Sequence, residues 1–123
     1  MYLPRLLLLA VLSVTALGKK AQSSAYETYF KKQSSSTPVN LDERQFAELT
    51  TGQRDYHTAI VLTALDAKYA CSICREFSPE WKILANSWQK SDKQGNNRML
   101  FGTLDFEKGR NVFISVSNIH KNV

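Results

Sequence analysis

The sequence is poor in the residues that mark fibrous, disulfide-stapled and low-complexity proteins. Two cysteines in 123 residues are too few for a small disulfide framework, which at this length typically uses about four to eight. Five glycines and three prolines exclude a collagen-like chain, and a hydrophobic share of 43% excludes a wholly disordered one. The length leaves room for one folded domain.

The excess of positive charge is small and is scattered along the chain. Sixteen Lys and Arg residues against eleven Asp and Glu residues give a formal net charge of +5. These basic residues form no compact stripe of the kind that a nucleic-acid groove needs, so we expect no nucleic-acid partner. Glycine-rich phosphate loops and local Ser/His/Asp signatures are also missing, and no motif predicts a cofactor.

A long and mainly apolar run occurs only at the N-terminus. Arg5 precedes the run from Leu6 to Leu17, which ends at the small residue Gly18. A charged start, an apolar stretch of about 7–15 residues and a small-residue end are typical of a secretory signal peptide. A membrane anchor would need about 20 apolar residues, more than this run provides. We therefore predict a signal peptide over residues 1–18 and entry into an oxidising compartment.

Residues 19–37 are rich in lysine, glutamine, serine and threonine and end in a serine-rich break. Tyr26, Tyr29 and Phe30 lie at helical spacing and allow a short amphipathic turn, but the polar composition favours a flexible segment. We therefore expect a flexible polar lead-in over residues 19–37 and an ordered domain over residues 38–123.

The first half of this domain carries a helix signal followed by a strand signal. Asp42 and Gln45 are spaced as a capping box, which predicts a short helix from about Glu43 to Leu49. Residues 58–65 then form a continuous apolar and β-branched run. Such a run is typical of a central strand that is buried on both faces of a parallel sheet.

The second half of the domain predicts a helix and another strand. Phe77, Trp81, Leu84 and Trp88 recur at helical spacing and mark one apolar stripe. Residues 99–106 form the second buried strand. A strand, a helix and a strand in this order predict a βαβ unit with parallel strands and a right-handed crossover, and hence an α/β fold.

Cys71 and Cys74 form a C-x-x-C motif where the first predicted strand leads into the helix. A helix N-terminus carries unpaired N–H groups and about half a positive charge, which favour a thiolate at Cys71. Cys74 lies one turn later, near enough to close a disulfide with Cys71. We therefore predict a redox pair, with Cys71 as the exposed attacking thiol and Cys74 as the shielded resolving thiol.

Two other interpretations of this cysteine pair are open. The pair could be half of a zinc site, but zinc needs further ligands, and His57 and His120 do not lie at ligand spacing. The pair could also be an inert structural disulfide, although so small a loop constrains the unfolded chain very little. We favour redox activity over both and expect no metal site.

Five segments carry a resemblance to a known family: T-A-L-D at residues 63–66, C-S-I-C-R-E-F at residues 71–77, Glu80-Trp81, Gly102–Phe106 and Val112-Phe113. They resemble the lumenal domain of the Ost3/Ost6 family, the thioredoxin-like subunits of the eukaryotic oligosaccharyltransferase. The resemblance implies an α/β fold, a thioredoxin-like βαβ sandwich. The family's domain continues through a cis-proline strand, a further strand, a last helix and transmembrane helices, so we expect a partial domain here, incomplete at its C-terminus.

The resemblance also implies a function in protein N-glycosylation in the endoplasmic reticulum. The chain would be an accessory subunit of the oligosaccharyltransferase complex, placed in the lumen and linked to the membrane only through further C-terminal helices. Its partners would be other subunits of the complex and nascent cysteine-containing polypeptides. Cys71 and Cys74 would hold those polypeptides in transient mixed disulfides, while another subunit transfers the glycan.

Two alternatives to this function remain open. A free-standing lumenal thiol–disulfide oxidoreductase of the disulfide-isomerase kind would use the same two cysteines without a complex. A peptide-binding module would keep the C-x-x-C as a structural disulfide only. The behaviour of a Cys74→Ser variant separates the module from both redox functions.

Overall fold

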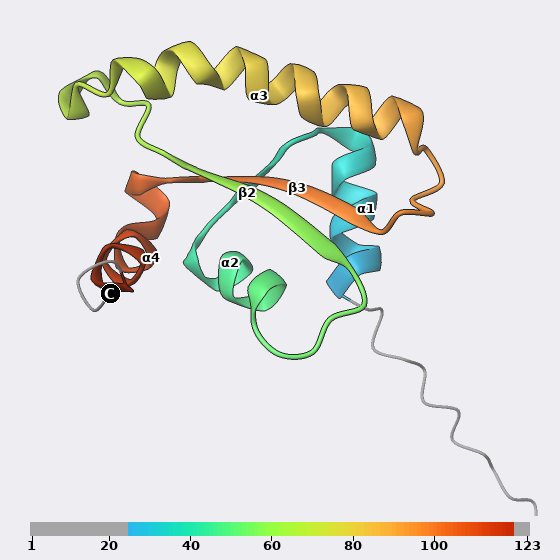
Figure 1. Cartoon of the computed structure of the whole chain (residues 1–123). Helices are drawn as coiled ribbons and strands as arrows, with labels where there is room; N and C mark the ends of the chain where they lie inside the picture. The colour runs from blue at the N-terminus through green and yellow to red at the C-terminus, as the bar shows by residue number, and fades with distance from the viewer. Residues whose placement is uncertain (1–24, 120–123) are drawn as a thin grey trace, which may run out of the picture.

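The structure is a computed structural model that describes residues 25–119 (Figure 1). Three parallel strands form one sheet in the order β1-β3-β2, and helices flank it on both faces. This arrangement confirms the predicted thioredoxin-like α/β class. The elements in chain order are α1 (Ala25–Ser35), β1 (Val39–Leu41), α2 (Glu43–Thr50), β2 (His57–Thr63), the short 3-10 helix η1 (Ala67–Tyr69), α3 (Ser72–Ser91), β3 (Met99–Asp105) and α4 (Phe106–Ile119).

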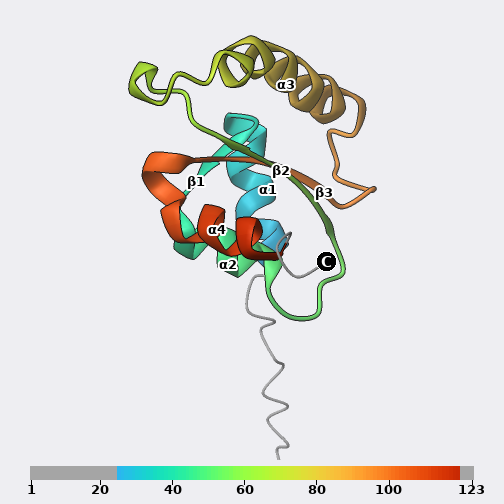
Figure 2. The same cartoon turned by 60° about the vertical axis from the view of Figure 1, so that its left-hand side comes forward.

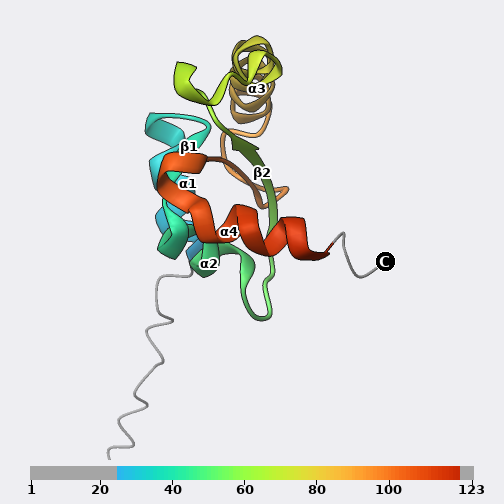
Figure 3. The same ribbon diagram turned by 90° about the vertical axis from the view of Figure 1, so that its left-hand side faces the viewer.

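The helices divide into two layers, because side chains alternate between the two faces of each strand. Helix α3 covers one face, and α1, α2 and α4 lie together on the other (Figures 2 and 3). On β3, Leu100 and Leu104 are buried in the core under α1, α2 and α4, whereas Phe101 packs with Trp81 and Ala85 of α3. Apolar side chains on the two faces of β3 thus contribute to both halves of the core.

The predicted βαβ unit is confirmed, but the central strand is not the one expected. Strands β2 and β3 pair in parallel from His57↔Met99 to Thr63↔Asp105, with α3 between them in the chain. Among the described residues β3 is central and β2 is an edge strand, so the prediction of a central strand over residues 58–65 is wrong. An apolar run predicts that the side chains of a strand are buried. It does not predict whether other strands pair with both edges of that strand.

Helix α2 begins as its sequence predicts. Gln45 N–H donates to Asp42 Oδ1 at 2.8 Å, and Asp42 N–H donates to Gln45 Oε1 at 2.9 Å, which completes the capping box. Leu41, just before the cap, is buried in the core and Phe46 packs against the same cluster. Each of these contacts is local in sequence, which explains why the pattern alone revealed them.

Helix α1 overturns part of the predicted lead-in. The flexible segment expected over residues 19–37 is wrong for Ala25–Ser35, which form a helix with Tyr26 and Tyr29 in the core. The helical spacing of these aromatic residues marked a buried face, and their burial outweighs the polar composition around them. The ordered domain therefore includes α1, and the predicted signal peptide lies outside the described residues.

Gln33 on α1 is the buried polar residue that joins the layers. The residue is 1% exposed. Its Oε1 accepts a hydrogen bond from Phe101 N–H at 2.6 Å, and its Nε2 donates to the Met99 carbonyl at 3.1 Å and to Gln89 Oε1 at 2.9 Å. Strand β1 pairs with β3 only from Gly102 onward. The Gln33 amide therefore takes the place of a neighbouring strand at the start of β3.

The apolar stripe of α3 is rotated relative to the prediction. Trp81 and Ala85 are buried against the sheet, and the Trp88 ring lies 5.9 Å from that of Phe101. Leu84, which the stripe would bury, is 52% exposed. The side of α3 that carries Trp81 and Ala85 faces the sheet, because the small Ala85 side chain lets the helix backbone approach the strands. Leu84 therefore lies on the side of the helix and not against the sheet.

None of the helices between Ala25 and Ile119 is both long and apolar enough to cross a membrane.

The substitution Gln33→Leu should lower the free energy of unfolding by about 2–4 kcal/mol, because it leaves a buried N–H and a buried C=O of β3 without partners. Urea unfolding monitored by circular dichroism measures this loss. Gln89→Leu is the matched control, because it leaves both bonds from Gln33 to β3 in place. It removes the bond to Gln33 and the exposed, 3.4 Å bond to Ser34 Oγ, and should cost less than about 1 kcal/mol. Equal losses for the two variants would contradict the strand-replacing role of Gln33.

Candidate functional site

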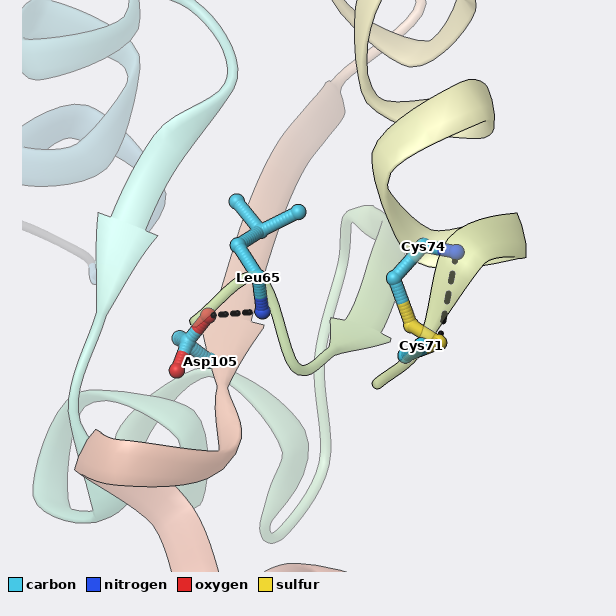
Figure 4. Close-up of a disulfide and its surroundings, with 4 residues drawn as sticks. All are labelled: Leu65, Cys71, Cys74 and Asp105. Atoms are coloured by element: carbon cyan, nitrogen blue, oxygen red, sulfur yellow. Dashed lines mark hydrogen bonds between the residues drawn. A yellow bond between two sulfur atoms is a disulfide. The ribbon is translucent and has the colours of Figure 1, made fainter. Parts of the chain in front are cut away.

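Cys71 and Cys74 form a disulfide at the N-terminus of α3 (Figure 4). Cys71 is the N-cap residue, and its Sγ accepts a hydrogen bond from Cys74 N–H at 3.3 Å. The structure thus brings together the two residues of the predicted redox pair, at the predicted start of a helix. A sulfur atom takes the role that a serine or aspartate oxygen usually plays at a helix N-cap.

The electrostatic surroundings of the pair favour negative charge on sulfur. Helix α3 is 20 residues long and has no acidic residue in its first turn. Its free N–H groups and dipole therefore act on the Cys71 sulfur without a competing carboxylate on the same turn. Breaking the disulfide here leaves a thiolate facing the positive end of a helix, which is the form that takes part in exchange.

Both cysteines fall in the half-buried range of exposure. Ser72 and Ile73 between them are exposed. The contrast between an exposed Cys71 and a shielded Cys74 stays a prediction. The two residues differ in their surroundings, because Cys71 caps the helix and Cys74 lines a groove.

The groove beside Cys74 has a volume of about 470 Å³ and lies between α3 and the ends of the strands. Phe77 and Trp81 form an apolar wall on the helix, and Thr63 and Thr103 supply hydroxyl groups from the strands. Trp81 Nε1–H donates to Thr103 Oγ1 at 3.1 Å, which fixes the indole in this wall. The groove was not predictable from the sequence, because it is built from segments that meet only in the folded chain.

Two carboxylates anchor the loop that leads from β2 to Cys71. Leu65 N–H donates to Asp105 Oδ2 at 3.1 Å (Figure 4). Lys68 forms an ion pair with Glu107, and Tyr69 Oη–H donates to Glu107 Oε1 at 2.9 Å. The hydrogen bond from Lys68, followed by that from Tyr69, lowers the pKa of Glu107, and the bond to Glu107 raises the pKa of Lys68. No sequence motif pointed to Glu107.

Ala70, directly before the redox pair, has a left-handed backbone conformation. Its φ of 49° and ψ of 34° end the short helix η1 and turn the chain toward Cys71. A residue with a Cβ atom pays about 1–2 kcal/mol in this region. The loop contacts hold the backbone in this turn.

Within residues 25–119, no group of three or more His, Cys, Asp or Glu side chains is placed to hold a metal ion.

The sequence matches known proteins along most of the described chain. A family model described as the OST3/OST6 family, transporter family, matches residues 27–118. Dolichyl-diphosphooligosaccharide–protein glycosyltransferase subunit MAGT1 of Danio rerio is 37% identical over 76 residues, which cover 61% of this chain and 23% of the relative.

Two further relatives come from human and fission yeast. Subunit MAGT1 of Homo sapiens is 38% identical over 60 residues, 49% of this chain and 18% of the relative. Subunit 3 of the same glycosyltransferase from Schizosaccharomyces pombe is 32% identical over 76 residues, 61% of this chain and 24% of the relative. The matches thus span about a quarter or less of the length of these relatives.

The substitution Ala70→Gly should raise the free energy of unfolding of the disulfide form by up to about 1 kcal/mol, because glycine adopts the left-handed conformation without a Cβ clash. Ala70→Val should lower it by about 1–2 kcal/mol, because a β-branched residue fits this region poorly. Urea unfolding checks both. Ala67→Gly, in the preceding turn, is the control and should lower stability slightly. A valine variant as stable as the glycine variant would be inconsistent with the left-handed turn.

Proposed function

This chain belongs to the OST3/OST6 family, and we propose that it is an accessory subunit of the oligosaccharyltransferase complex in protein N-glycosylation. The observation that carries the proposal is the C-x-x-C pair at the start of α3, within the segment that the family model matches. The named relatives are subunits of a dolichyl-diphosphooligosaccharide–protein glycosyltransferase. Transfer of the glycan itself would belong to another subunit.

The cysteine pair would hold a nascent polypeptide by thiol–disulfide exchange. A thiolate of the polypeptide attacks Cys71 Sγ, the bond between Cys71 and Cys74 breaks, and its electron pair leaves on Cys74 Sγ. Release runs in the opposite direction: the Cys74 thiolate attacks Cys71 Sγ and expels the polypeptide sulfur as a thiolate. The cycle needs no external oxidant, because every sulfur returns to its starting state.

The helix N-terminus and the groove support this cycle. The N–H groups at the start of α3 stabilise the thiolates that form and leave during exchange. The groove beside Cys74 offers the apolar wall of Phe77 and Trp81 together with the hydroxyls of Thr63 and Thr103. Apolar surface with a few polar groups is suited to an extended peptide segment, which brings both side chains and backbone amides.

The proposed place of action is the lumen of the endoplasmic reticulum. The signal peptide expected over residues 1–18 would deliver the chain there, where nascent polypeptides carry both free and paired cysteines. Other subunits of the complex and nascent cysteine-containing polypeptides are the proposed partners. A membrane link would depend on helices outside the described residues.

The substitution Cys74→Ser leaves Cys71 as a free thiolate, which should attack a disulfide of the polypeptide, form a mixed disulfide and expel the second polypeptide sulfur as a thiolate. The polypeptide should then stay trapped, because no Cys74 thiolate is present to release it. In cells, the variant should accumulate reductant-sensitive adducts with cysteine-containing glycoproteins, seen as high-mass bands on non-reducing gels. Cys71→Ser is the matched control and should form none. If Cys74→Ser yields no adducts although it is folded, the pair is structural and the peptide-binding module becomes the better function.

Association with the complex should not depend on the cysteines, because transient disulfides to clients are separate from contacts between subunits. An affinity-tagged chain should copurify with the other oligosaccharyltransferase subunits, and the Cys71→Ser/Cys74→Ser double variant should copurify equally well. Quantitative mass spectrometry of the purified material measures both. A wild-type chain that forms client adducts but is recovered without those subunits would favour the free-standing oxidoreductase.

A further inference from the structure

The loop between β2 and Cys71 is tied to the start of α4 by two carboxylates. Both oxygens of Asp105 are occupied by backbone N–H groups: Oδ2 accepts from Leu65 and Oδ1 accepts from Glu107, at 3.1 and 3.0 Å. One side chain thus holds the beginning of the loop and the beginning of α4 together. Asparagine could not replace it, because an amide has one acceptor oxygen.

Glu107, one residue into α4, holds the other end of the same loop. Its Oε1 is the partner of both Lys68 and Tyr69, the last but one and the last residue of η1. The Tyr69 ring also packs edge-on against Phe106, with the ring centroids 5.0 Å apart. Arg110, one turn along α4, approaches the Tyr69 hydroxyl at 3.5 Å. Charge, hydrogen bonding and ring packing therefore fix the backbone two residues before Cys71.

The two ends of the disulfide differ in how they are held. The amide of Cys74 lies inside the first turn of α3, so its position follows from the helix. Cys71 precedes that helix, and the backbone on its N-terminal side is the loop that Asp105 and Glu107 hold. When the disulfide is reduced, the two sulfur atoms must separate to non-bonded contact. Cys71 is the residue free to move, and the loop contacts resist that movement.

We propose that Asp105 and Glu107 are positioning residues that hold Cys71 close to Cys74 and so favour the disulfide over the dithiol. This inference rests on the proposed exchange function and adds to it the groups that set its redox equilibrium. We call Asp105 and Glu107 the carboxylate clamp. The clamp acts through the backbone of residues 65–70, and neither carboxylate touches a sulfur atom in the contacts described above.

The redox equilibrium is measured with glutathione as the co-reactant. Two glutathione thiols reduce the Cys71–Cys74 disulfide, which gains two electrons and two protons, and they form one glutathione disulfide. The full chain is incubated at pH 7 in defined ratios of glutathione and its disulfide. Free thiols are then blocked with a maleimide that adds mass, and the dithiol fraction is read on a gel.

The variants Asp105→Asn and Glu107→Gln should each shift this equilibrium toward the dithiol by about threefold to tenfold, a fraction of what a charged hydrogen bond contributes. Each keeps the size of the side chain and removes part of its accepting capacity. A purely structural role would lower the unfolding midpoint of the oxidised and reduced forms equally and leave the equilibrium unchanged. The positioning role requires a larger loss for the oxidised form.

Glu48→Gln is the matched control. Tyr29 Oη–H donates to Glu48 Oε2 at 3.0 Å, the same kind of bond as that between Tyr69 and Glu107, but it joins α1 to α2 and does not involve the loop before Cys71. This variant should lose some stability and keep the wild-type redox equilibrium.

A second variant separates positioning from charge. In Glu107→Gln the Lys68 ammonium is unpaired and could stabilise a Cys71 thiolate directly, which also favours the dithiol. Lys68→Met/Glu107→Gln also removes the Lys68 ammonium, so a shift that persists in this double variant supports positioning. A return to the wild-type equilibrium in the double variant, together with no shift in Asp105→Asn, would overturn the carboxylate clamp.

Other outcomes are equally decisive. Wild-type equilibrium constants in both single variants would overturn the clamp while leaving the exchange function intact. A wild-type disulfide that never equilibrates with glutathione would overturn the proposed exchange and the clamp together. The first result is seen only in the variants, and the second is seen in the wild-type chain. A failure of the clamp can therefore be distinguished from a failure of the exchange function.

Discussion

The backbone of β3 must be hydrogen-bonded along both of its edges, and the rest of the structure depends on how this is done. Strand β2 pairs with β3 along its whole length, whereas β1 covers only the last part of the opposite edge. The amide of Gln33 covers the first part. Because this amide also reaches Gln89 on α3, one buried side chain fixes α1 below the sheet and α3 above it.

The site follows from the parallel pairing of β2 and β3. Thr63 lies opposite Asp105 in the register, so the chain that leaves β2 runs beside the chain that leaves β3. The first continues into the loop that carries Cys71, and the second continues into α4. The carboxyl ends of parallel strands bring loops together at one edge of a sheet. The parallel topology therefore already places the loop that leads to Cys71 beside α4. The side-chain contacts between them depend on this placement.

The features that were predictable are those encoded by neighbours in sequence. Asp42 and Gln45 predict a helix start, and the spacing of Cys71 and Cys74 predicts their disulfide, because the two residues of each pair lie within one helical turn. The order of the strands and the role of Gln33 were missed. Gln33 meets Phe101 across 68 positions, and a lone glutamine in a polar segment gives no local sign of burial. The groove and Glu107 escaped prediction for the same reason.

Helix α4 connects the loop before Cys71 to the core, because its first turn faces that loop and its middle faces the core. Phe106 at its start packs edge-on against Tyr69 of the loop and also against Phe113, which lies against the core cluster. Gly109 between them has a non-helical backbone and is buried, and a Cβ there would lie 2.6 Å from Leu104 Cδ2. The kink thus lets α4 press close to β3 while its first turn stays beside the loop. A chain of aromatic contacts then runs from the residue before Ala70 into the core, and this gives the loop before Cys71 a rigid support.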